Sequence, residues 1–192
     1  MADIASQTSD LLQTDDSVLV IVDIQGKLLN AMPTSVAESM LANTGKILIA
    51  AGLLDVPVLL TEQYPKGLGP TEEAISKQLP DGAQCFDKTA FSCCGCDAFS
   101  QALVATGRKQ VILVGQEAHV CVLQTAIDLH RQGYAAHVLE DAVCSRSDSH
   151  KHNALRRLSQ LGITISNHES VLFEWLRDAK HKDFKAISAL LR

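Results

Sequence analysis

Four short runs of the chain are apolar nearly throughout, and this pattern limits the choice of fold more than any other feature. A strand with one face in water alternates apolar and polar side chains, whereas a strand covered on both faces is apolar along its length. The runs are Val18 to Val22, Val56 to Leu60, Val111 to Val114 and Ala135 to Leu139. They predict a parallel sheet that is buried between helices.

Stretches with helical spacing separate these runs. Weaker strands at Gln84 to Phe86 and Ile163 to Ile165 bring the total to about six β units that alternate with helices. We therefore predict an α/β fold: a three-layer sandwich whose six-stranded parallel sheet is doubly wound and Rossmann-like. The expected helices each stop at a glycine, as helices often do: Ser35 to Gly52, Ala98 to Gly107, Val120 to Gly133 and Ser149 to Gly162.

The chain reads as a single domain over residues 1–192. Its 192 residues are 46% hydrophobic, which is enough for one substantial core, and no Pro/Gly/Ser-rich linker divides them. Residues 1–15 are polar enough for us to expect a mobile segment. The stretch from Asp183 to Arg192 is amphipathic and is expected to pack on the body or on another subunit.

Composition excludes several classes of partner. The net charge of −5 comes from dispersed acidic residues, and no Lys/Arg stripe is present to neutralise phosphates, so we expect no nucleic-acid partner. No run approaches the ~20 apolar residues of a membrane helix, and the start lacks a secretory pattern. We expect a cytoplasmic protein without membrane contact, whose six cysteines stay as thiols.

Three residues that can carry chemistry follow expected strands. Asp23 leaves the first apolar run, Lys88 follows the weak third strand, and Cys121 lies in the first turn of the helix after the Val111 to Val114 run. A helix start favours a thiolate through its free N–H groups and dipole. Taken singly, each residue has a simpler explanation: a turn-capping Asp, a solvated Lys and a small buried Cys. Their joint presence favours a catalytic site.

This order of Asp, Lys and Cys resembles the pattern of the isochorismatase-like cysteine hydrolases. Four further segments are similar to the isochorismatase domain-containing subgroup of that family: Thr61 to Pro70, Lys88 to Ser92, Gln116 to Cys121 and Asp141 to Ser147. The resemblance covers most of the chain, and it implies a six-stranded parallel sheet.

The resemblance also implies a mechanism. Cys121 would be the nucleophile, Asp23 the proton acceptor and Lys88 the charge stabiliser, and a covalent thiol intermediate would form on a carbonyl carbon. A cis peptide bond between Gln116 and Glu117 is implied, with the N–H groups of Glu117 and Cys121 forming an oxyanion hole. The candidates for the substrate pocket are Gln25, Tyr64, Phe91 and Glu117.

The sequence lacks the features of a metal site. Nicotinamidases of this superfamily carry histidine after the second strand, whereas Thr61 to Pro65 contains none, so we expect neither metal nor cofactor. Enzymes that act on isochorismate itself lack the nucleophilic cysteine, so Cys121 also argues against that substrate. The Cys93 to Cys96 cluster has C-x-x-C spacing but no second ligand pair for zinc. We expect His119 at the pocket rim or at an interface, and Arg146 at an interface.

Three hypotheses for function remain open. The first is a hydrolase that cleaves a C–N bond of a small amide-like molecule. The second is an oligomeric binding or scaffold protein with the same fold and no physiological turnover. The third is a thiol sensor in which Cys121 pairs with Cys93, Cys94 or Cys96. The family usually forms oligomers, so we expect a homo-oligomer in each case.

Overall fold

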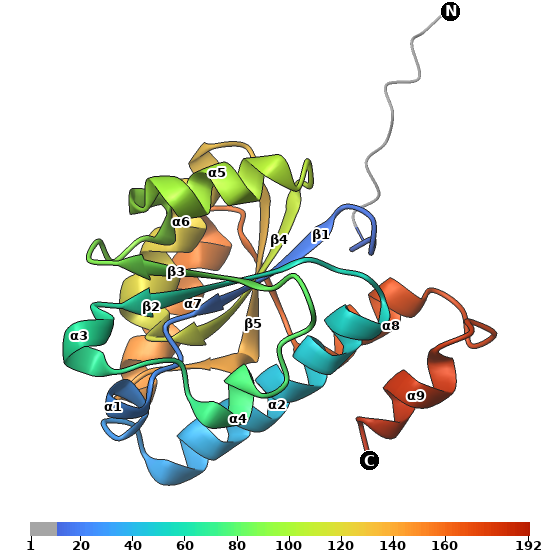
Figure 1. The fold of residues 1–192 in the computed structure, drawn as a ribbon, viewed down its shortest axis with the longest axis horizontal. Coiled ribbons are helices and arrows are strands. Elements are labelled where there is room, and N and C mark those ends of the chain that lie inside the picture. The colour runs from blue at the N-terminus through green and yellow to red at the C-terminus, as the bar shows by residue number, and fades with distance from the viewer. Residues whose placement is uncertain (1–10) are drawn as a thin grey trace, which may run out of the picture.

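Six parallel strands form one sheet in the order β3-β2-β1-β4-β5-β6 in the computed structural model, which describes residues 11–192 (Figure 1). Every neighbouring pair in the sheet is parallel. The strands are β1 (Ser17–Val22), β2 (Val58–Gln63), β3 (Gln84–Lys88), β4 (Gln110–Gln116), β5 (Ala135–Cys144) and β6 (Thr164–Ser166). The predicted six-stranded parallel sheet is confirmed.

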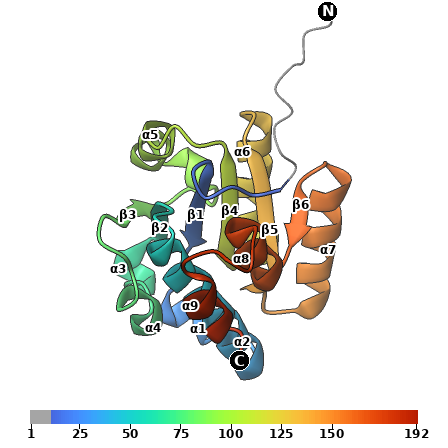
Figure 2. The ribbon, with the colours of Figure 1, turned by 90° about the vertical axis from the view of Figure 1, so that its right-hand side faces the viewer.

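Helices cover both faces of the sheet, which explains why β1 and β4 are buried at every position. One hydrophobic core lies under α2 (Thr34–Leu53), α8 (His168–Leu176) and α9 (Phe184–Ala189). The other lies under α5 (Asp97–Ala105), α6 (Leu123–Arg131) and α7 (Asp148–Gln160). Figure 2 shows the two helical layers on either side of the strands. The three-layer sandwich is therefore confirmed.

Short helical turns lie in the connections that follow β1, β2, β3 and β4. They are α1 (Gly26–Leu29), α3 (Pro65–Leu68), α4 (Glu73–Ser76), η1 (Cys93–Gly95) and the π-helical turn η2 (Ala118–Val122). The sequence predicts one helix from Val120 to Gly133, whereas the structure has η2 first and α6 from Leu123. Cys121 thus lies in a π-helical turn that precedes the α-helix.

The strand order creates a switch point between β1 and β4. From β1 the chain adds β2 and β3 on one side, and then returns to pair β4 with the other side of β1. At such a point the loops that leave the two neighbouring strands turn to opposite faces, and a crevice opens between them. Asp23 follows β1 and Glu117 follows β4, so both flank this crevice.

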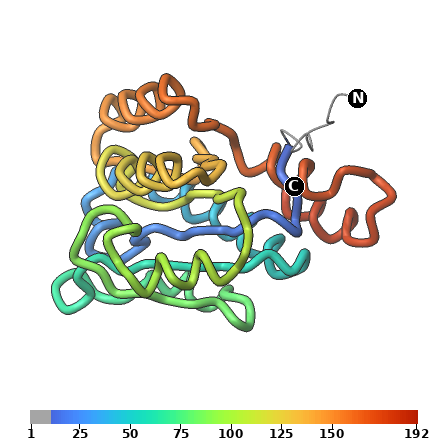
Figure 3. Tube along the Cα trace, turned by 90° about the horizontal axis from the view of Figure 1, so that it is seen from above, coloured from blue at the N-terminus to red at the C-terminus, as the bar shows by residue number. Residues whose placement is uncertain are grey.

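The two ends of the described chain pack together. Leu12 is buried and its N–H donates to Glu174 Oε2 at 2.8 Å, while the Trp175 indole N–H donates to Ser17 Oγ at 3.0 Å. In the segment expected to be mobile, Leu12 thus contacts α8 and Gln13 contacts Gln110 of β4, while residues 1–10 lie outside the described residues. Figure 3 shows the red C-terminal segment forming one end of the molecule.

The amphipathic C-terminal stretch packs on the body of the same chain. Ile187 of α9 is fully buried, and Phe184 and Leu191 pack against the α2 side of the sheet. The sequence analysis did not predict helix α8.

Within residues 11–192, no helix combines the length and the apolar character needed to cross a membrane.

Gly115 of β4 lies directly beside Val22 of β1, next to the crevice. It has φ +112°, and a Cβ built on it would lie 2.1 Å from the carbonyl oxygen of Val22. We expect Gly115→Ala to lower the free energy of unfolding by at least about 3 kcal/mol, because backbone strain and a backbone clash add. Urea denaturation measures this loss.

Gly107→Ala is the matched control, since Gly107 also has a positive φ, of +69°, but open space where a Cβ would lie. It should cost about 1 kcal/mol from backbone strain alone. Equal losses in the two variants would show that β1 and β4 have room for a side chain at Gly115.

Candidate active site

The carboxyl ends of four adjacent strands bring the three candidate catalytic residues together. Asp23 directly follows β1, Lys88 is the last residue of β3, and Cys121 lies in η2 after β4. Because the strands are parallel, these ends share one edge of the sheet although the residues are up to about a hundred positions apart. Asp23 has φ +51°, a left-handed turn that ends the strand at once and leaves its carboxylate at this edge.

Asp23 and Lys88 form a buried ion pair. Lys88 Nζ lies 2.7 Å from Asp23 Oδ2, and the two side chains are 1% and 0% exposed. Thr61, in β2 between them, donates its hydroxyl to the other oxygen, Oδ1, at 2.7 Å. Both carboxylate oxygens are therefore hydrogen-bonded, which compensates the cost of burying the charge.

The ammonium group of Lys88 is fully occupied by protein acceptors. Besides Asp23 it contacts Gln63 Oε1 at 2.6 Å and the carbonyl oxygens of Ala90 and Phe91 at 3.2 and 3.0 Å. Three N–H donors shared among four acceptors leave none for a ligand. In this arrangement Lys88 supplies positive charge to the site and holds the loop from Thr89 to Phe91.

Cys121 completes the cluster through a hydrogen bond with Asp23. Burial and the Asp23 carboxylate raise the pKa of the Cys121 thiol above its ordinary value, and Lys88 only partly opposes them. The expectation that the helix dipole favours a resting thiolate is therefore wrong: an adjacent anion and low exposure outweigh it. The resting group is a thiol that donates to a carboxylate.

Asp23 is suited to accept that proton. Burial raises the pKa of its carboxyl group, while Lys88, Thr61 and Cys121 act in the opposite direction. A carboxylate whose pKa is raised is a stronger base than a solvated one. The pair thus has a buried base in contact with a weakly acidic thiol.

The loop after β4 contributes a fixed backbone to the site. The peptide bond between Gln116 and Glu117 is cis. The buried Gln116 amide donates to the carbonyl oxygen of Asp23 at 3.1 Å and accepts from the Cys144 thiol at 3.5 Å. The Glu117 carboxylate accepts from both the backbone N–H and Nε of Arg146, each at 3.0 Å.

A model of the isochorismatase domain matches residues 17–170, which include every residue of this cluster. The chain belongs to the isochorismatase family. It is 40% identical over 182 residues to isochorismatase domain-containing protein 2 of Danio rerio, covering 94% of this chain and 89% of the relative. It is 38% identical to the secreted isochorismatase effector Isc1 of Phytophthora sojae, covering 100% and 93%.

Solved isochorismatase-like structures have the same fold. The structure of a Caenorhabditis elegans protein named MAR1 ribonuclease has a TM-score of 0.89 and 34% identity, covering 94% of this chain and 92% of that one. The Escherichia coli YcaC gene product, described as an octameric hydrolase of unknown specificity, has a TM-score of 0.87 and 25% identity, covering 95% and 89%.

A pocket of about 320 Å³ in this isochorismatase-family chain is lined by Lys88, but not by Asp23 or Cys121. Tyr64, Pro65 and Lys66 line it from the β2 side, and the segment from Asp87 to Thr89 lines it from the β3 side. Tyr64, a predicted substrate-pocket residue, lines this hollow. Phe91 is 53% exposed and lies two residues beyond the lining segment, while its carbonyl oxygen contacts Lys88.

Two expected pocket residues have structural partners. Gln25 is fully buried, its Oε1 accepts from the Gln63 N–H at 2.8 Å, and its Nε2 donates to the carbonyl oxygens of Gln63 and Gly69. It therefore fixes the loop after β2, and both of its amide hydrogens are used within the protein. Glu117 is buried under Arg146, so its side chain serves that ion pair.

Sequence reasoning missed the residues that hold the ion pair. Thr61 and Gln63 bind Asp23 and Lys88 directly, and the buried Cys93 contacts Thr61 Oγ1 at 3.5 Å. The available signal was position: Thr61 and Gln63 lie at the carboxyl end of a predicted parallel strand, next to the end of β1. Cys93 gave no such signal, since η1 brings it back under the site.

The remaining clusters offer no metal site. Among residues 11–192, no group of three or more His, Cys, Asp or Glu side chains is placed to hold a metal ion. His119 contacts Ser145 Oγ at 3.0 Å and stacks near His150, with a ring distance of 4.7 Å. All six cysteines are free thiols.

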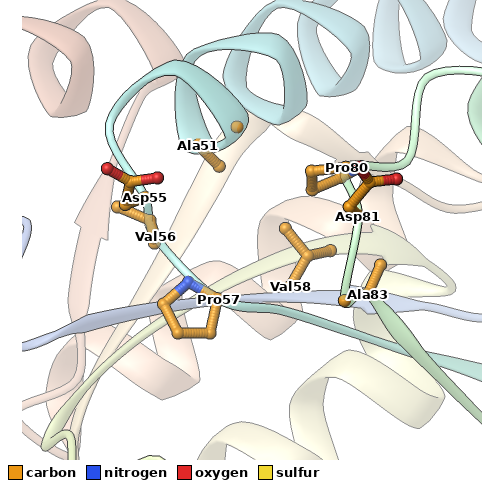
Figure 4. Close-up of a pocket in the computed structure, with 10 residues that line it drawn as sticks. Ala51, Asp55, Val56, Pro57, Val58, Pro80, Asp81 and Ala83 are labelled. Atoms are coloured by element: carbon orange, nitrogen blue, oxygen red, sulfur yellow. The ribbon is translucent and has the colours of Figure 1, made fainter.

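A second hollow of about 300 Å³ lies at the amino-terminal ends of β2 and β3, away from the strand ends that carry Asp23 and Lys88. Figure 4 shows Asp55 and Asp81 on opposite sides of it, with Val58 between them. Apolar side chains and two carboxylates line it, and no nucleophile does.

We expect Lys88→Met to lower the free energy of unfolding by about 3–5 kcal/mol at pH 7.5, because it leaves a buried carboxylate without its cation. The loss should shrink at about pH 5. Burial already raises the pKa of Asp23, and without Lys88 it rises further, so the folded variant takes up a proton as the pH falls. Urea denaturation at both pH values measures this.

Lys77→Met is the control, since Lys77 forms an exposed pair with Glu73. Its loss should stay within about 0.5 kcal/mol at both pH values. A Lys88→Met loss that is independent of pH would mean that Asp23 does not carry the buried charge.

Proposed function

We propose that this protein is a cysteine hydrolase that cleaves a C–N bond of a small amide-like substrate through a covalent thiol intermediate. The observation that carries the proposal is the contact of the Cys121 thiol with the Asp23 carboxylate, which is itself paired with Lys88. A nucleophile in hydrogen-bond contact with an oriented base is the arrangement that covalent catalysis requires. Membership of the isochorismatase family supports hydrolysis.

The first half of the proposed reaction forms a thioester. Asp23 accepts the proton of the Cys121 thiol, and the sulfur attacks the carbonyl carbon of the substrate. The N–H groups of Glu117 and Cys121 donate to the oxygen as it becomes negative. The C–N bond then breaks, and the leaving amine takes the proton from Asp23.

The second half releases the acid. Asp23 accepts a proton from water, the hydroxide oxygen attacks the thioester carbon, and the C–S bond breaks. The proton on Asp23 returns to the sulfur, which restores the resting thiol. Lys88 stays charged throughout and stabilises the carboxylate in the steps where Asp23 is ionised.

The Caenorhabditis elegans relative named as a ribonuclease suggests RNA as another substrate class. The net charge of −5 disfavours a phosphate backbone, and we propose no nucleic-acid partner. RNA hydrolysis and binding without turnover are instead outcomes against which the amide hydrolase is tested. We further propose a cytoplasmic homo-oligomer, in line with the octameric Escherichia coli relative.

We expect a panel of small amides to contain a substrate that acylates Cys121. Mass spectrometry of the quenched reaction should detect the acyl group on the peptide that contains Cys121. Cys121→Ala should show neither adduct nor turnover, whereas Cys85→Ser, which changes an exposed thiol of β3, should retain both. Cleavage of RNA that survives in Cys121→Ala would overturn the proposal.

We expect the rate of Cys121 alkylation by iodoacetamide to be flat across neutral pH. Two coupled groups that share one proton keep a constant thiolate fraction between their two pKa values. The raised pKa of Cys121 extends this plateau above the range of ordinary thiols. In Asp23→Asn the pKa of Cys121 should fall, and the rate should rise about tenfold per pH unit until the thiol ionises.

Mass spectrometry follows the alkylation of each cysteine, and the exposed Cys85 serves as the internal reference. The same pH profile for Cys121 in the parent protein and in Asp23→Asn would show that the two groups are not coupled. That result would leave the binding or scaffold protein as the better account.

A further inference from the structure

Cys93 is a fully buried thiol next to the triad that takes no part in the proposed reaction. It lies in η1, and its Sγ is 3.5 Å from Thr61 Oγ1. Its backbone N–H donates to Thr125 Oγ1 at 2.9 Å, one helical turn beyond Cys121. The residue is thus held from two sides, its side chain against Thr61 of β2 and its backbone against Thr125 in the helix that follows Cys121.

The hydrogen inventory of these groups fixes which atom donates. Thr61 has one hydroxyl hydrogen, and the Asp23 carboxylate can only accept, so that hydrogen lies in the 2.7 Å contact with Asp23 Oδ1. The Thr61 oxygen is then free only to accept. A hydrogen bond between Cys93 and Thr61 therefore has the S–H group as its donor. Thr125 is a second hydrogen-bond partner of the Cys93 side chain.

Cys93 is able to keep this hydrogen. Burial, followed by the nearby Asp23 charge, raises the pKa of Cys93 to about 11, so the group stays a thiol at neutral pH. The nucleophile and Cys93 are in this respect alike, but only Cys121 contacts the carboxylate itself. Cys93 reaches Asp23 through one hydroxyl group.

We propose that Cys93 and Thr61 are positioning residues, and that the directed chain from Cys93 S–H to Thr61 O–H to Asp23 sets the orientation and proton affinity of the catalytic carboxylate. Lys88 holds Oδ2 and this chain holds Oδ1. Because a donor to the Thr61 oxygen polarises its O–H bond, the thiol strengthens the bond that Thr61 makes to Asp23. The proposal rests on the proposed role of Asp23 as proton acceptor.

The chain makes the carboxylate a weaker base than burial alone would produce. Removing the Thr61 hydroxyl should therefore raise the pKa of Asp23, since that hydrogen bond lowers it. A stronger base takes the thiol proton more often, so the plateau rate of Cys121 alkylation should increase. A variant that merely disturbs the site would react more slowly or lose the plateau, so the direction of the change is diagnostic.

The experiment measures the pH profile of Cys121 alkylation by iodoacetamide in variants of the full chain. Below the plateau the alkylation rate falls as the pH falls, and we call this part of the profile the acid limb. In Thr61→Val the acid limb should move up by about one pH unit and the plateau rate should rise about tenfold, as the loss of one charge-assisted hydrogen bond predicts. Thr61→Ser should restore the parent profile. Thermal unfolding of each variant reports whether it is folded.

Cys93→Ala tests the first link and leaves Thr61 in place. It should move the acid limb up by about half a pH unit and raise the plateau rate about threefold. Cys93→Ser should reverse both changes because serine retains a donor. Cys94→Ala is the matched control, since its sulfur neighbours Ser92 and Gln132 instead of the triad. It should leave the profile unchanged.

The infrared S–H stretching band gives a readout that does not depend on Asp23 as a base. The difference spectrum between the parent protein and Cys93→Ala should contain a band displaced to lower frequency by hydrogen bonding. A band at the frequency of a free thiol, or unshifted profiles in both Thr61→Val and Cys93→Ala, would overturn the chain. An unshifted Asp23→Asn profile with the displaced band present would overturn the proposed function alone.

Discussion

The ion pair between Asp23 and Lys88 is the constraint on which the rest of the site depends. Burying the charged Asp23 carboxylate without partners would cost much free energy. The fold must therefore also provide a cation beside it and hydrogen-bond donors to both of its oxygens. Lys88 can supply the cation only because β3 pairs with β2 and places its last residue at the same edge as the end of β1. The buried charge of Asp23 is thus neutralised only because this strand order places Lys88 beside it.

The surrounding polar groups follow from the same requirement. Gln63 accepts from Lys88, and Gln25 in turn fixes the backbone on both sides of Gln63. On the other side of the switch point, Gln116 binds the backbone of Asp23. These buried side chains leave the carboxylate of Asp23 little freedom to move.

Much of the fold could be predicted from the chain, because buried parallel strands carry a clear pattern. The apolar runs located the four inner strands, and the helical spacing located α2, α5 and α7 to within about two residues. Helix α8 was missed and η2 was taken for the start of α6. Both errors concern residues whose conformation depends on packing: α8 on the N-terminal segment, and η2 on the turn out of β4.

The sequence by itself determined which chemical groups are present and at which strand ends they lie: an acid after β1, a lysine at the end of β3 and a cysteine after β4. The position of a strand end can be read from the residues adjacent to it in the sequence, so no tertiary contact is needed to locate these groups. Only the tertiary structure decided the protonation of Cys121, the occupation of Lys88 by protein acceptors, and the place of Cys93 beneath Thr61. Burial and the distance between charges set these properties, and both arise from segments that are far apart in the chain.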